Sequence, residues 1–236
     1  MYIVDRPTPQ RCALGCALLL VVLATLSCSA RRPAPPADMS GFLDEYGLLR
    51  AGGSDDVRLV YRNPDADWTR YHAVLLEPVT IWRSGRKSLD AVPEDDLFRL
   101  AYDFEKALRV RLGGGFRLVD QPGPGVMRIR LGMTEARATD PILDVFTVPP
   151  GGKPAVGGGN AVNAETRRFL DAAIIEGEIV DAENGEVLAQ GVDGPRGANA
   201  PALDTWAAVD RGLARWVDRL CARLEARTGA GGAETR

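Results

Sequence analysis

The feature that most constrains the fold of this chain is a pair of one-sided apolar stripes. Residues 93–112 and 206–226 both place apolar side chains at i, i+3, i+4 and i+7, so each segment predicts an amphipathic helix. The first stripe contains Leu97, Leu100, Ala101, Phe104, Leu108 and Leu112, and the second contains Val209, Leu213, Trp216, Val217, Leu220 and Leu224. Because each helix is apolar on one side only, each needs one partner surface.

The other patterned segments predict strands. They are residues 57–61, 73–82, 116–119, 127–134, 170–180 and 186–192. Within the second of them Pro78 cannot donate to a ladder, which indicates an edge, a bulge or a break after Leu76. The last two strands are joined through Asn184 and Gly185, which tolerate the positive φ of a hairpin turn.

This order of elements predicts an α/β (α+β) fold. Two helices of this length would cover one face of a sheet of about five strands, giving a two-layer sandwich with a mixed, mostly antiparallel sheet. Residues 40–49 carry apolar side chains at helical spacing, which predicts one or two amphipathic turns packed onto the domain. Residues 140–163 lack periodicity and form a long connection, which is typical of a functional or a disordered segment.

The N-terminal residues predict where in the cell the protein is located. Arg6 and Arg11 precede an apolar run that ends at Leu26, and small residues follow it. A basic region, a short apolar region and a small-residue exit are typical of a secretory signal, and the run is shorter than the roughly 20 residues of a spanning helix.

The exit of this run, Thr25-Leu26-Ser27-Cys28, resembles the lipobox of bacterial lipoproteins, whose cysteine is acylated and becomes the first mature residue. Ser27 and Cys28 match that pattern, whereas Thr25 stands where leucine is preferred. Lipid attachment at Cys28 with cleavage after Ser27 is therefore expected. Two alternatives stay open: cleavage at an A-x-A-like site that includes Ser29, releasing a soluble protein, and an uncleaved, poor anchor.

These features divide the chain into a lipoprotein signal peptide (residues 1–27), a lipidated proline-rich tether (28–40), one α/β domain (41–228) and a disordered tail (229–236). The expected place is the cell envelope, anchored by lipid and facing the periplasm. By resemblance to the sorting rule of enteric bacteria, Ser29 favours the outer membrane. Cys221 is then left unpaired, beside an apolar helix face, and is expected to be a buried small hydrophobe.

Four short motifs are distributed over the mature chain: residues 41–46 (GFLDEY), Val60-Tyr61 before Asn63-Pro64, Glu77-Pro78-Val79, and the hairpin of residues 181–189 (DAENGEVLA). In these motifs the mature chain as a whole resembles bacterial lipoproteins of the domain of unknown function (DUF) 3313 family. This resemblance implies an envelope lipoprotein with a fold like the N-terminal domain of the periplasmic TolB protein. It implies no activity.

The sequence favours no catalytic or metal chemistry. His72 is the single histidine, it lacks a flanking nucleophile motif, and one histidine without paired mature cysteines does not supply the usual zinc ligands. The acids at Asp90, Glu94, Asp95 and Asp96 suit a helix N-terminus. Asp181, Glu183 and Glu186 suit a turn. No catalytic residue, metal or cofactor is expected.

The sequence predicts a binding or adaptor module in the envelope. Its expected partners are the membrane lipid, through acylated Cys28, and an unknown envelope protein or peptidoglycan. Nucleic acid is not expected, because the net charge is −3 and the lysines are few. An envelope hydrolase without a recognisable motif and a passive structural lipoprotein are the alternatives.

The candidate interaction loop contains Ile142, Leu143, Val145 and Phe146, four apolar residues in a glycine-rich connection. A solvated loop has little reason to hold them so close together, which favours binding. The alternative is that they form a strand of the sheet, which would leave only residues 149–163 free.

Overall fold

The computed structural model describes residues 40–53, 56–84, 89–135, 143–147, 160–194 and 203–230. All of them belong to one compact unit within Pro35–Arg236. The predicted signal peptide, most of the tether, Ile142, residues 148–159 and residues 231–236 lie outside the described part. Among the helices that are described, none combines the length and the apolar character that a membrane crossing requires.

The described strands form one mixed sheet. They are β1 (Arg50–Ala51), β2 (Leu59–Arg62), β3 (Ala73–Leu76), β4 (Thr80–Ser84), β5 (Arg117–Leu118), β6 (Val126–Glu135), β7 (Leu143–Thr147), β8 (Ala173–Asp181) and β9 (Val187–Asp193). Their order is β1-β2-β9-β8-β6-β3-β5, with β4 against β6 and β7 against β4. Most neighbouring pairs are antiparallel, as expected, but the sheet contains nine strands in place of about five.

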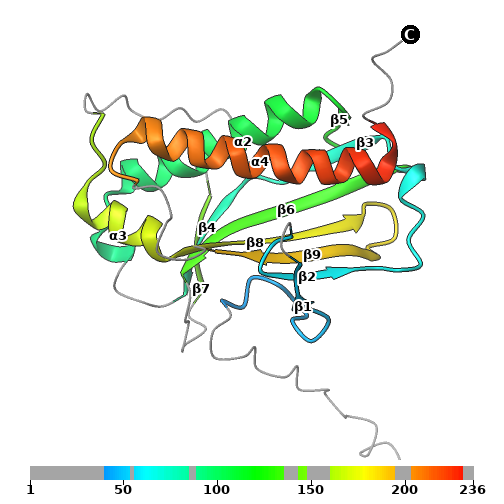
Figure 1. The fold of residues 1–236 in the computed structure, drawn as a ribbon, viewed down its shortest axis with the longest axis horizontal. Coiled ribbons are helices and arrows are strands. Elements are labelled where there is room, and N and C mark those ends of the chain that lie inside the picture. Colours follow the sequence, from blue (N-terminus) through cyan, green and yellow to red (C-terminus); the bar gives the residue numbers. More distant parts are fainter. Residues whose placement is uncertain are drawn as a thin grey trace, which may run out of the picture. The chain divides into compact units, whose positions relative to one another are not determined.

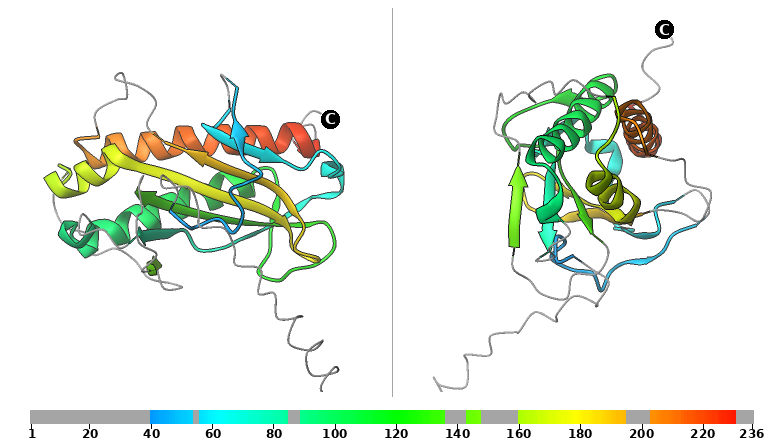
Figure 2. Two further views of the ribbon diagram at one scale, coloured as in Figure 1. Left: turned by 90° about the horizontal axis from the view of Figure 1, so that it is seen from below. Right: turned by 90° about the vertical axis from the view of Figure 1, so that its left-hand side faces the viewer.

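Two long helices, α2 (Glu94–Gly113) and α4 (Trp206–Thr228), lie side by side on one face of this sheet (Figure 1). Both match the predicted stripes, and the two-layer α+β architecture is confirmed. A short helix, α3 (Ala164–Ala172), lies at the end where α2 and α4 begin (Figure 2). There Thr166 Oγ1 donates to Asp96 of α2 at 2.5 Å. Single 3₁₀ turns occur at Trp68–Arg70 and Leu89–Ala91.

Of the three alternatives for Pro78, an edge, a bulge or a break after Leu76, the break is the one found. Strand β3 ends at Leu76 and β4 begins at Thr80, with Pro78 between them. Both pieces run parallel to β6: β3 pairs with its first half, where Leu76 lies opposite Ile129, and β4 pairs with its second half, where Thr80 lies opposite Gly132. The proline thus interrupts the ladder where the chain passes from one pairing to the next.

The two faces of the sheet bury different side chains. The face under the helices is the main core, in which Phe104 of α2 packs edge to face on Trp216 of α4 at 5.4 Å between ring centroids. The opposite face, called here the second face, carries a smaller apolar cluster of Phe42, Leu43, Leu49, Ile174 and Val192. Strand β8 contributes to both clusters, with Ile179 in the main core and Ile174 on the second face, so the sheet is covered on both sides.

Two local expectations are corrected. Residues 40–49 pack onto the domain but contain no helix, since they fold as turns and bends held by side chains. The segment after residue 163 forms α3, where a connection and the start of a strand were expected. The two long helices also end differently: α2 ends on Gly114 in the right-handed region at φ −75°, whereas α4 ends on Gly229 in the left-handed region at φ +76°.

Candidate functional site

The most elaborate polar site lies on the second face, where residues 40–49 are bound. We call these residues the docking segment. Phe42 and Leu43 are 2% and 3% exposed. The Phe42 ring meets Trp82 of β4 edge to face at 5.5 Å, and Trp82 Nε1 donates to the carbonyl of Ser40 at 3.1 Å. The chain therefore enters the described domain from the second face, opposite the helices.

The Tyr46 hydroxyl joins this segment to the sheet. It accepts from the N–H groups of Gly41 and Leu43 at 3.0 and 3.1 Å, and it donates to Glu176 Oε2 at 2.5 Å. Burial, then the neighbouring Glu176 carboxylate, raises the pKa of Tyr46 above its ordinary value. A phenol that stays protonated keeps its hydrogen bond to Glu176, so the docking segment is held at neutral pH.

Beneath the docking segment, polar side chains form a ladder across β6, β8 and β9. Glu176 is fully buried and also accepts from Thr134 Oγ1 at 3.1 Å. Two positions along β8, Glu178 accepts from Arg130 at 3.2 Å and from Gln190 Nε2 at 2.9 Å. The Arg130 guanidinium also lies 4.8 Å from the Phe42 ring centroid. Each buried carboxylate thus has hydrogen-bond donors, as a buried charge requires.

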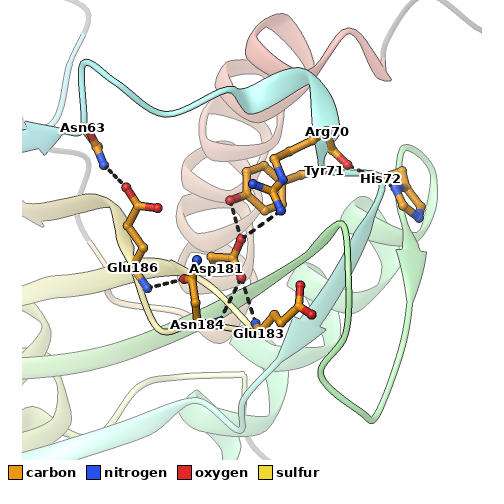
Figure 3. Close-up of polar contacts among 8 residues, drawn as sticks. All are labelled: Asn63, Arg70, Tyr71, His72, Asp181, Glu183, Asn184 and Glu186. Carbon is orange, nitrogen blue, oxygen red and sulfur yellow. Dashed lines mark hydrogen bonds and ion pairs between the residues drawn. The ribbon is translucent and has the colours of Figure 1, made fainter.

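A second polar cluster holds the β8–β9 hairpin (Figure 3). Asp181 accepts from the Tyr71 hydroxyl at 2.8 Å and from the N–H groups of Glu183 and Asn184. Burial acts to raise the pKa of Asp181, but these hydrogen bonds and the charge of Arg70 outweigh it, so the pKa lies below its ordinary value. Gly185 has φ +78°. The predicted hairpin turn and its turn chemistry are confirmed.

The residues weighed for catalysis have local roles in the structure. The exposed His72 ring lies 3.2 Å from the carbonyl of Arg70 (Figure 3). Cys221 is fully buried in the main core, and burial raises the pKa of its thiol to about 11. Glu94, Asp95 and Asp96 occupy the first turn of α2. Across the described residues, no three His, Cys, Asp or Glu side chains gather as metal ligands would.

The site residues expected from the sequence are only partly described. Ser27, Cys28 and Ile142 lie outside the described residues. Leu143, Val145 and Phe146 belong to β7, whose backbone pairs antiparallel with β4, so that Phe146 lies opposite Ile81. The alternative reading, in which these residues form a strand of the sheet, is therefore the arrangement found. Of the portion that this alternative leaves free, residues 149–163, the structure describes only residues 160–163.

Sequence analysis missed Glu176, Glu178 and Gln190 as a group. Glu176 and Glu178 alternate with Ile175, Gly177 and Ile179, a pattern typical of a strand with one wet face. The signal that was available is the tyrosine of GFLDEY, since a tyrosine in an apolar segment needs a hydrogen-bond partner when it is buried.

Fold and site together define a two-layer α+β domain whose docking segment is bound to the second face of its own sheet. The sequence matches the family model described as "Protein of unknown function (DUF3313)" over residues 38–220. The chain belongs to this family, as its motifs predicted. No curated protein and no solved structure matched it.

Proposed function

We propose that this protein is a lipid-anchored component of the bacterial cell envelope that acts as a non-catalytic binding or adaptor module. The observation that carries the proposal is the apolar run that ends in Ser27-Cys28, twelve residues before the docked Ser40. Two or three acyl chains on Cys28 would hold the protein stably, since each buried CH₂ contributes about 0.8 kcal/mol.

The way in which the chain enters the domain supports this proposal. When the tether ends on a segment that is bound to the sheet, the side of the domain that faces the anchor is fixed. A tether that ends on an unbound stretch of chain would not fix it. Trp82, Tyr46 and Glu176 fix that end by hydrogen bonds at 3.1 and 2.5 Å. In the proposed topology the second face receives the anchor, and the helix-covered face is available to an envelope protein or to peptidoglycan.

Lipid attachment is tested by replacing Cys28 with serine in cells that are fed a clickable fatty acid. The Cys28→Ser protein is expected to lose the label and to leave the membrane fraction or to stay unprocessed. Cys16→Ser is the matched control, because that cysteine lies within the same signal and should keep full labelling. Label retained after Cys28→Ser would show that the lipobox assignment is wrong.

The partner is tested by crosslinking in intact cells with photoreactive residues placed on α2 and α4, for example at Val110, which is 73% exposed. A discrete crosslinked product that is absent from the matched site on the second face, Asp44, is expected. Products only from the second face would place the partner on the wrong side and contradict the proposed topology.

A further inference from the structure

The main core is not packed evenly along α4. Between the second half of this helix and the sheet, the structure contains a cavity of about 90 Å³, called here the inner cavity. Most of its walls are apolar side chains from α4, β2, β6 and β8, among them Val60, Ile129, Ile175, Ile179, Leu220 and Leu224. Because protein interiors leave few voids larger than a water molecule, a space of this size under a core helix is unusual.

Small residues form the floor of the inner cavity. Gly177 of β8 lies opposite Gly191 of β9, and Ala189 of β9 lies opposite Ile179. The two glycines and the alanine all line the cavity, so the sheet presents little side-chain volume to α4 at this place. Glycine inside a strand weakens the strand and often marks a position where a ligand or another backbone approaches closely.

The inner cavity continues along α4. An adjoining cavity of about 350 Å³, called here the outer cavity, shares Ile175, Asp193 and Trp216 with it. Apolar side chains of α3 and of the first half of α4 line this second space, among them Leu170, Val209 and Leu213. The two cavities together thus extend along the helix. Since an apolar cavity of about 150 Å³ binds benzene, the combined space accommodates a chain of several CH₂ groups.

The charges around the inner cavity balance one another. Its lining contains three acids and three arginines, namely Asp56, Glu178, Asp193, Arg62, Arg223 and Arg227. Arg62 pairs with Asp56, and Asp193 accepts from Trp216 Nε1 at 3.1 Å. Glu178 accepts from two side chains of the polar ladder. A charged ligand would lose its hydration here without meeting an excess of opposite charge, which is costly. The lining therefore favours an uncharged ligand.

We propose that this space binds an uncharged alkyl-chain molecule, such as a fatty alcohol or a monoacylglycerol, with the chain in the inner cavity and the hydroxyl head in the outer one. The outer cavity is lined by the exposed side chains of Asp171 and Arg215, which can accept from and donate to a hydroxyl group. The inference goes beyond the proposed adaptor role and does not depend on lipid attachment at Cys28.

The test titrates the full-length Cys28→Ser chain, which carries no acyl chain at that position, in digitonin, a detergent without an alkyl chain. The ligands are 1-butanol, 1-hexanol and 1-octanol. Binding is followed by the melting temperature and by tryptophan fluorescence, since Trp68 and Trp216 both line the inner cavity. Each added CH₂ should tighten binding about fourfold. Binding that does not strengthen with chain length would contradict the proposal.

The charge of the head group is tested at a fixed chain length. At neutral pH, octanoate and octylammonium carry opposite charges on the same chain. Both should bind at least about tenfold more weakly than 1-octanol, because neither charge finds an uncompensated partner. Binding of either ion as tight as that of 1-octanol would show that the site selects a charged ligand, and would overturn the proposal.

Two variants that fill the inner cavity and one matched control decide the location. Ala189→Leu enlarges a side chain on the floor and should abolish the dependence on chain length. Ala214→Leu makes the same change at an exposed position of α4 and should leave binding unchanged. Val60→Phe fills the cavity from β2, so it decides the outcome if Ala189→Leu fails to fold. Absence of 1-octanol binding, or equal binding by folded filled variants, would overturn the proposal.

Discussion

The two faces of the sheet are both buried, but they are buried by different means. Under α2 and α4 the contacts are apolar, and residues such as Phe104, Leu108 and Met127 are fully buried. On the second face a short segment without regular structure covers Glu176, Glu178 and Thr134, and a tyrosine hydroxyl joins cover to sheet. The helix side is held mainly by buried apolar area, whereas the second face combines a smaller apolar cluster with a few hydrogen bonds.

This difference indicates which part of the domain can detach while the rest stays folded. Apolar burial is lost gradually with area, but a buried polar group that loses its partner costs its whole desolvation energy at once. We therefore expect the docking segment to detach as a unit while the helix-covered core stays folded. Four predictions test that contrast, in order of decreasing effect.

The largest effect is expected from Phe104→Ala in the main core. Truncation of a fully buried phenylalanine typically costs about 3–5 kcal/mol, and here the ring also loses its contact with Trp216. Urea unfolding followed by circular dichroism measures the free energy of unfolding. Val110→Ala, on the exposed side of the same helix, should change it by less than about 0.5 kcal/mol; a similarly small loss for Phe104→Ala would show that the stripe is not core.

Tyr46→Phe should act on the second face alone. The change removes one donor to Glu176 and one acceptor for Gly41 and Leu43, at a cost of about 1.5–3 kcal/mol. Hydrogen exchange should become fast at residues 41–49 and stay slow in α2 and α4. The matched control is Tyr61→Phe on β2, for whose hydroxyl the described residues provide no partner. Faster exchange throughout the domain would contradict independent opening.

Two glycines on opposite faces provide a direct comparison. A methyl group on Gly132 would lie 2.7 Å from the Phe42 ring, and one on Gly177 would lie 2.4 Å from Leu131 Cδ2. Overpacking costs about 1–3 kcal/mol. Gly132→Ala should displace only the docking segment, seen as loss of protection at Leu43, and Gly177→Ala should lower the main unfolding transition. The comparison fails if both variants give the same exchange pattern.

The smallest effect is expected in the pH dependence, through Asp181 at the hairpin. Its pKa is lowered in the folded state, so the ionised form stabilises the fold at neutral pH, and that stability is lost as the pH falls through the folded pKa. Asp181→Asn, which retains an acceptor oxygen for the turn, should flatten the acid side of the stability profile. An unchanged acid limb would show that other carboxyl groups determine it.

The sequence predicts best what depends on periodicity. The stripes of α2 and α4 each extend over about four turns. Their apolar positions face the sheet or the neighbouring helix, so pattern and structure agree. The hairpin and the interruption at Pro78 could also be predicted from the sequence, because the backbone freedom of glycine and the missing N–H of proline act locally.

Cooperation between distant segments was not accessible to pattern analysis. The apolar spacing of Phe42, Leu43, Tyr46 and Leu49 suggested a helix, but Tyr46 instead turns the chain back on itself by accepting from Gly41 and Leu43. Likewise α3 has few apolar positions. It is held by the Asn163 cap, where Oδ1 accepts from Glu165 N–H, and by the hydrogen bond that Thr166 of α3 donates to Asp96 of α2. The Tyr46–Glu176 and Thr166–Asp96 hydrogen bonds join residues far apart in sequence, and no local period indicates them.

The docking segment also limits how far the domain can lie from its anchor. With Cys28 as the anchor point, as proposed, the free chain ends at Ser40 and extends at most about 40 Å. If the Tyr46–Glu176 hydrogen bond broke and the docking segment detached as far as β1, the free chain would reach about 75 Å at full extension. One hydrogen bond at the centre of a small interface would then nearly double the distance from the membrane at which the domain can meet a partner.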